Sequence, residues 1–138
     1  MTLYQSIYKK LVQIGILNNN GKMPHMYMKF TCEGMMGLSC DRLTNSMIAI
    51  AHNGLLNGDV MADPDVQIVI YPGKKEAVGI TFQNDYIGIY QDINATGKVN
   101  EKLKNEINIF LDDWLSNIIN CEYKLSDGQF VLDWYYML

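Results

Sequence analysis

The stretch from residue 99 to 120 constrains the fold most, because its apolar residues recur at the spacing of an α-helix. These apolar residues share one face, and glutamate, lysine, aspartate and asparagine residues occupy the opposite face. The residues of the apolar face are Leu103, Ile107, Phe110, Leu111, Trp114, Leu115 and Ile118. Such a helix has to bury this face against a second layer. The sequence therefore predicts a long helix over 99–120, packed on another layer with Trp114 buried.

A shorter amphipathic helix is predicted near the N-terminus. Its apolar residues are Leu3, Ile7, Leu11 and Ile14, which share one helical face. Thr2 precedes them and is a suitable N-cap, since a threonine hydroxyl accepts a hydrogen bond from the first turn. The run NNNG that follows ends the helix, because asparagine and glycine tolerate the left-handed conformation.

The sequence between the two helices reads as a series of β-strands. The candidate strands are HMYMKFTC (25–32), EGMMGLSCDRL (33–43), NSMIAIAHN (45–53), DVQIVIYPG (65–73), KEAVGITFQND (75–85) and YIGIYQDI (86–93). Their links are too short for helical crossovers, which indicates an antiparallel meander. After the second helix, Asp127-Gly128 predicts a hairpin turn in the tail. Residues 1–138 thus form a single α+β domain: an antiparallel sheet of four to six strands, with the N-terminal helix and the long second helix packed on it.

Composition and charge exclude several classes of function. Apolar residues make up 49% of the 138 residues and the net charge is −4. Arg42 is the only arginine, so we expect no direct binding of nucleic acid, which requires a concentrated basic face. No apolar run is long enough to span a bilayer or to act as a signal peptide. The three cysteines include no CxxC and suit reduced thiols, so we expect a cytoplasmic protein without membrane contact.

The segment AHNGLLNGDVMADPDV (51–66) is the strongest candidate for chemistry. His52 is suited to act as a general base, and Asp59, Asp63 and Asp65 could hold Mg²⁺ or Mn²⁺ from a loop. The simpler interpretation is a turn: Asn, Gly and Asp residues dominate turns, and an aspartate before a proline can cap its own backbone. No nucleophile elbow or phosphate-binding loop accompanies the segment. The sequence therefore predicts no catalytic residue, no metal ligand and no cofactor.

A second polar and aromatic cluster lies in FQNDYIGIYQD. Its Asn84-Asp85 pair is most simply a turn, and its tyrosines either pack on the sheet or contact a partner. The candidate binding residues are His52, Asp59, Asp63, Asp85, Tyr86, Tyr90 and Asp92. The apolar-aromatic tail FVLDWYYML either closes over the core or pairs with a second copy, which would give a homodimer.

From the His52 segment to Trp114 the chain resembles an uncharacterised small-protein family of bacteriophages and conjugative elements. The resemblance rests on IAIAHNGLLNGDVMADPDVQIVIYP, AVGITFQNDYIGIYQDI and LKNEINIFLDDWLSNI. The shared pattern is Ala-His, a spacer, Asn-Gly-Asp, Met, Asp-Pro and a strand, then Asn-Asp, Gly and Tyr-Gln, then a helix bearing leucine and tryptophan. It covers about half of the chain and not the tail after Asn120.

This resemblance implies an accessory protein of a mobile genetic element, working in a bacterial cytoplasm. We therefore expect a non-enzymatic binding protein that inhibits a host defence system such as CRISPR-Cas, with a host protein or ribonucleoprotein as partner. Two alternatives stay open. One is a module that binds a small molecule such as a nucleotide signal, and the other is a metal-dependent hydrolase built on His52, Asp59, Asp63 and Asp65.

Overall fold

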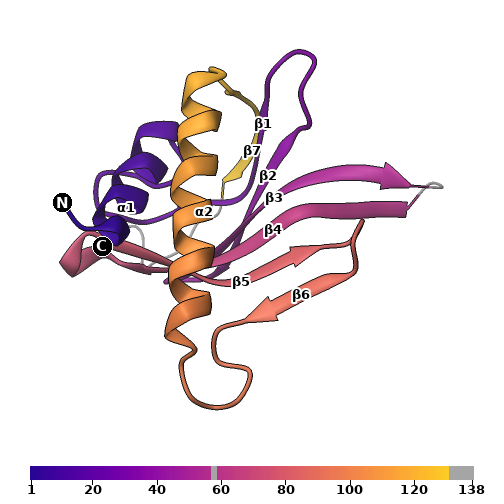
Figure 1. Cartoon of the computed structure of the whole chain (residues 1–138). Coiled ribbons are helices and arrows are strands. Elements are labelled where there is room, and N and C mark those ends of the chain that lie inside the picture. The colour runs from indigo at the N-terminus through magenta and orange to yellow at the C-terminus, as the bar shows by residue number, and fades with distance from the viewer. Residues whose placement is uncertain (57–58, 131–138) are drawn as a thin grey trace.

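The computed structural model describes residues 1–56 and 59–130, and of residues 53–62, 129 and 130 it describes the backbone at most. The elements in chain order are α1 (Leu3–Ile14), β1 (His25–Thr31), β2 (Leu38–Thr44), β3 (Met47–Leu56), β4 (Asp59–Tyr71), the 3₁₀ turn η1 (Pro72–Lys74), β5 (Glu76–Asn84), β6 (Ile89–Asp92), α2 (Glu101–Asn120) and β7 (Lys124–Phe130). The strands form one antiparallel sheet in the order β6-β5-β4-β3-β2-β1-β7, and both helices cover the same face (Figure 1). The predicted α+β class with an N-terminal helix and a longer second helix is confirmed.

The core lies between the two helices and this sheet face. From α1 it receives Ile7 and Leu11, which are fully buried. The strands contribute their alternate residues, because side chains along a strand point to opposite faces. These residues are Met28, Phe30, Leu38, Cys40, Ile48, Ile50, Val66, Ile68, Ile70 and Ala77. The buried Cys40 thiol has a raised pKa, mainly because burial disfavours the thiolate, so it serves as a small apolar core residue.

Both helices begin at the residues that local sequence favours. The Thr2 hydroxyl accepts from Gln5 N, and the Gln5 side chain accepts from Thr2 N, which forms a complete capping box. α1 ends at Gly15, whose φ of 98° is left-handed and costs glycine little. Asn100 caps α2 by accepting from Leu103 N at 3.0 Å. In the part of the chain that the structure describes, no helix is long and apolar enough to cross a membrane.

The described residues form a sheet of seven strands, so the prediction of four to six was too low. The added strand is β7, which pairs with β1 beyond the end of the meander. Asp127 and Gly128 lie inside β7, opposite Lys29 and Met28, and the predicted hairpin at this pair is wrong. A Cβ on Gly128 would lie 3.2 Å from Nδ1 of His25, so glycine here allows β7 to approach β1 closely.

The segment 51–66 is mostly strand rather than an extended turn, which corrects the preferred sequence interpretation. β3 and β4 pair along its length, from Ala51 with Asp65 to Leu56 with Asp59, and leave only residues 57–58 to connect them. Between the pairs Ala51–Asp65 and Asn53–Ala62, one residue of β3 faces two residues of β4. This β-bulge places Asp63 and Pro64 opposite His52, and a bulge of this kind redirects side chains.

Candidate functional site

An exposed apolar surface lies on the β5–β6 hairpin, at the edge of the sheet. Its four large side chains are Tyr86, Ile87, Ile89 and Tyr90, which are 41%, 65%, 37% and 61% exposed. Asp85 and Asp92 flank these residues in the chain. We call these six residues the edge surface. Four exposed apolar side chains on one hairpin make it a candidate contact region, since exposed apolar residues are usually scattered singly.

The turn of the hairpin is held by hydrogen bonds of its own. Asn84 Oδ1 accepts from Tyr86 N at 3.1 Å, Asp85 O accepts from Gly88 N at 3.4 Å, and Gly88 has a left-handed φ of 65°. Gln83 Nε2 donates to Asp85 Oδ1 at 2.7 Å. The predicted Asn84-Asp85 turn is thus observed. Its side chains satisfy the local backbone, which leaves the aromatic residues to project outward.

Asp63 connects the bulge on β4 to the edge hairpin. Asn84 Nδ2 donates to Asp63 Oδ1 at 2.9 Å. Burial lowers the pKa of His52, and the nearby Asp63 carboxylate opposes this shift. The structure therefore brings together two predicted residues, His52 and Asp63, and connects them to the start of the hairpin that carries Asp85, Tyr86, Tyr90 and Asp92.

His52 points to the helix-covered face of the sheet. Its ring packs edge-on against Trp114 at 5.1 Å between centroids and stacks on Tyr123 at 5.9 Å. The Tyr123 hydroxyl donates to Met36 O at 2.8 Å and lies 3.4 Å from His52 Nε2. Burial lowers the pKa of His52 more than Asp63 raises it, so the ring favours its neutral form. This arrangement fits an aromatic packing role, because the ring is enclosed by Trp114 and Tyr123.

Asp63 and Asp65 do not share a site. Asp63 faces Asn84 and His52, whereas Asp65 lies near Asp41 and Asp85. The pKa of Asp65 is raised, first by burial and then by the charges of Asp41 and Asp85. Among the residues the structure describes, no group of three or more histidines, cysteines and acids has a metal-binding arrangement. The side chain of Asp59 lies outside the described residues, as does the tail segment 131–138 proposed to form a homodimer.

A groove beside the edge surface was not predicted from the sequence. It has a volume of about 190 Å³ and is lined by Phe82, Gln91, Glu106, Ile107 and Phe110. Phe82 and Phe110 meet edge to face at 5.4 Å, and Phe110 stays 40% exposed. The helical pattern of α2 had placed Phe110 on the buried face. Phe82 lies near the end of β5 beside the short strand β6, and its side chain is partly exposed.

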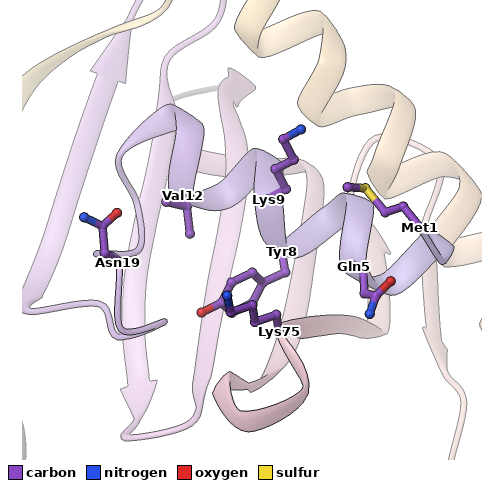
Figure 2. A pocket seen from close by; sticks show the side chains of 7 residues that line it. All are labelled: Met1, Gln5, Tyr8, Lys9, Val12, Asn19 and Lys75. Atoms are coloured by element: carbon purple, nitrogen blue, oxygen red, sulfur yellow. The ribbon is translucent and has the colours of Figure 1, made fainter.

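A second, larger cavity lies at α1, away from every predicted binding residue. It measures about 380 Å³ and is lined by Met1, Gln5, Tyr8, Lys9, Val12, Asn19 and Lys75. In Figure 2, Asn19 lies in the segment that links α1 to β1, and Lys75 lies in the turn that links β4 to β5. Its described lining includes two lysines and an aromatic ring and no carboxylate. Such a lining suits an apolar molecule that carries a negative charge.

Comparison with known proteins identifies the family and no more. Searches against curated proteins and against solved structures gave no match. The family model for a domain of unknown function, DUF6908, matches residues 6–123, and the chain belongs to this family.

Proposed function

We propose that this DUF6908 protein acts by binding, without catalysis, and that a macromolecular partner docks on the edge surface. The observation that carries the proposal is the gathering of Tyr86, Ile87, Ile89 and Tyr90 on one exposed hairpin at the edge of the sheet. Tyrosine and large apolar residues are enriched at the centres of protein interfaces, where they fill pockets of the partner. Asp85 and Asp92 beside them favour a partner with a basic surface.

The resemblance to proteins of mobile genetic elements extends this proposal to a biological setting. In that setting the partner is a bacterial host protein or ribonucleoprotein of a defence system such as CRISPR-Cas, and binding inhibits it. The net charge of −4 supports attraction to a surface that normally binds nucleic acid. The protein would then act in the cytoplasm of the bacterial host.

Capture from a bacterial lysate with matched variants tests the proposal. The tagged protein is compared with Ile87→Asp on the edge surface and with Leu125→Asp on β7, the strand at the other end of the described sheet order. Leu125 is 50% exposed, so both variants place a charge at an exposed apolar position. We expect a partner that binds the wild type and Leu125→Asp and is lost in Ile87→Asp. Equal capture by all three proteins would contradict docking on the edge surface.

A second candidate function is the binding of a small anionic molecule. The cavity at α1 favours it, because Lys9 and Lys75 can neutralise a negative group while Tyr8 and Val12 supply an apolar wall. Neither Tyr86 nor Tyr90 lines this cavity, so it is separate from the binding residues that the sequence suggested. Thermal stabilisation by a panel of nucleotides, lost in Lys9→Ala and Lys75→Ala, would support this function. No stabilisation by any member of the panel would count against it.

A catalytic role makes a different prediction. A metal-dependent hydrolase built on His52 would show turnover that stops in His52→Ala while the fold remains intact. Assays of the purified protein with nucleotide and phosphoester substrates, with and without Mn²⁺, provide the measurement. Turnover with that dependence on His52 would overturn the binding proposal.

A further inference from the structure

The edge strand β6 offers backbone groups as well as side chains to a partner. Ile93 N donates to Ile80 O at 3.0 Å, which continues the register in which Gln91 faces Phe82 and Ile89 faces Asn84. Backbone groups alternate in direction along an antiparallel strand. Ile89 and Gln91 therefore point their N–H and C=O groups at β5, whereas Tyr90 points both of its groups away from the sheet.

Asp92 presents one further group at the same edge. By the same alternation its N–H points outward, while its carbonyl accepts from Ala95 N at 3.2 Å within the following turn. No described strand lies beyond β6 in the sheet order. The Tyr90 N–H, the Tyr90 C=O and the Asp92 N–H thus form a short template for an added strand, as in complexes where a peptide extends a sheet.

We infer that β6 binds an extended, basic peptide segment as an additional antiparallel strand, with an arginine or lysine of that segment in the Phe82–Phe110 groove. This inference rests on the proposed function and names the chemistry of its partner. A residue paired with Tyr90 would place its side chain beside the tyrosine ring, on the face away from the helices. The peptide residues before and after it would point their side chains to the helix face, where Gln91 lines the groove.

The lining of the groove selects a long basic side chain. Phe82, Ile107 and Phe110 supply the apolar part of the lining, and Glu106 supplies a carboxylate from an exposed position. Arginine and lysine fit this combination, because their aliphatic stems pack on apolar surface while their charged ends reach a carboxylate. Arginine gains further from stacking on an aromatic face. Beside Tyr90, a β-branched residue is preferred, since aromatic and β-branched residues pair well across strands.

A synthetic peptide with this alternation provides the test. The probe is acetyl-Arg-Val-Arg-Val-Arg-amide, titrated into the ¹⁵N-labelled full chain and followed by NMR. We expect saturable shifts of the backbone amides in residues 89–92 and 106–110. A peptide N-methylated at both valines keeps its charge and loses the N–H groups needed for strand pairing, so we expect it to produce no saturable shifts there.

Two pairs of variants separate strand addition from simple charge attraction. Glu106→Gln and Asp113→Asn each remove one negative charge from an exposed position of α2, and only Glu106 lines the groove. We expect Glu106→Gln to weaken the peptide by about threefold to fivefold, as for a partly exposed ion pair, and Asp113→Asn to leave it unchanged. Tyr90→Pro should abolish binding through loss of its outward N–H, whereas Tyr90→Ala, which keeps that N–H, should retain it in part.

The outcomes distinguish this inference from the proposed function. Equal binding of the N-methylated peptide, or equal effects of Glu106→Gln and Asp113→Asn, would overturn strand addition. A single-stranded oligothymidine that shifts the same amides more strongly than the peptide would also overturn it. If strand addition fails while Ile87→Asp still loses the captured partner, the edge surface remains a docking site and its partner uses another geometry.

Discussion

The side-chain amide of Asn108 on α2 forms a hydrogen-bonded pair with the backbone of Gly79 on β5. Gly79 N donates to Asn108 Oδ1 at 2.7 Å, and Asn108 Nδ2 donates to Gly79 O at 3.0 Å and to Lys104 O at 2.8 Å. β6 pairs only with residues 81–84 and has ended before Gly79. Beyond the end of β6, the buried amide of Asn108 thus pairs with the Gly79 backbone as a neighbouring strand would. This pairing holds α2 over β5.

Replacing Asn108 by leucine should destabilise the fold strongly. Leucine has a similar size but leaves the buried N–H and C=O of Gly79 without partners, which costs about 2–4 kcal/mol in unfolding free energy. Urea unfolding followed by circular dichroism measures this loss. Asn105→Leu, at an exposed position of the same helix, is the control and should be close to neutral. A loss below about 1 kcal/mol in Asn108→Leu would show that the amide pair is dispensable.

Trp114 is predicted to be a main contributor to stability. It is only 6% exposed and contacts both His52 and Phe110. Trp114→Ala removes this packing and leaves a cavity, which typically costs about 3–5 kcal/mol. Phe110→Ala, at a 40% exposed position, should cost clearly less. Thermal and urea unfolding of both variants check the order. An unchanged melting temperature in Trp114→Ala would contradict the packing of α2 on the sheet.

Asp65→Asn should stabilise the protein at neutral pH. The folded state raises the pKa of Asp65 above its ordinary value of 3.8, through burial and through Asp41 and Asp85. Folding is therefore penalised wherever the carboxylate is charged, and the penalty disappears as pH falls through the folded pKa towards 3.8. We expect a higher melting temperature for Asp65→Asn at pH 7 and a smaller difference near pH 3.5. A variant less stable than the wild type at pH 7 would contradict this.

The pKa of His52 should fall further when Asp63 is neutralised. Burial already lowers this pKa below its ordinary value of 6.5, and the Asp63 carboxylate opposes the shift. Asp63→Asn removes that charge and keeps an oxygen that accepts from Asn84. We therefore expect a mild effect on stability and a lower pKa of His52 by NMR titration. An unchanged pKa would mean that Asp63 and His52 are not coupled.

The same pKa shift fixes how His52 affects stability across pH. The folded pKa of His52 lies below the unfolded value of about 6.5. The contribution of the neutral ring to the free energy of unfolding is therefore fully present above that pH. Stability is then lost as pH falls from about 6.5 towards the folded pKa. His52→Phe should flatten this part of the pH profile, measured by unfolding between pH 5 and about pH 7.

Local sequence patterns were sufficient to predict both helices and most strands. The Thr2 cap, the apolar face of α1 and the burial of Trp114 follow from short-range periodicity. The tail was predicted as a hairpin rather than the single strand β7, because Asp127-Gly128 has the chemistry of a turn. Only the nearby ring of His25 explains why a glycine lies inside a strand there. The burial of Asn108 was also missed, since an asparagine among helical polar residues carries no sign of the Gly79 backbone it pairs with.

The candidate site was predictable only in part. Asp85, Tyr86, Tyr90 and Asp92 were identified from one short polar and aromatic segment, and they lie together because a hairpin is a local structure. The groove residues Phe82, Glu106 and Phe110 come from two elements separated in sequence, so no local pattern links them. The bulge opposite His52 depends on the register of β3 with β4, and its effect on Asp63 and Asp65 required the structure.

Hydrogen–deuterium exchange of the complex with its captured partner tests the central claim most directly. Backbone amides report which segments are shielded by the partner, and exchange is measured with and without it by mass spectrometry. We predict slowed exchange in residues 85–92, with unchanged exchange in β7 at the opposite edge of the sheet. Protection confined to β7 or to α1, with residues 85–92 exchanging as in the free protein, would contradict the assignment of the edge surface as the binding site.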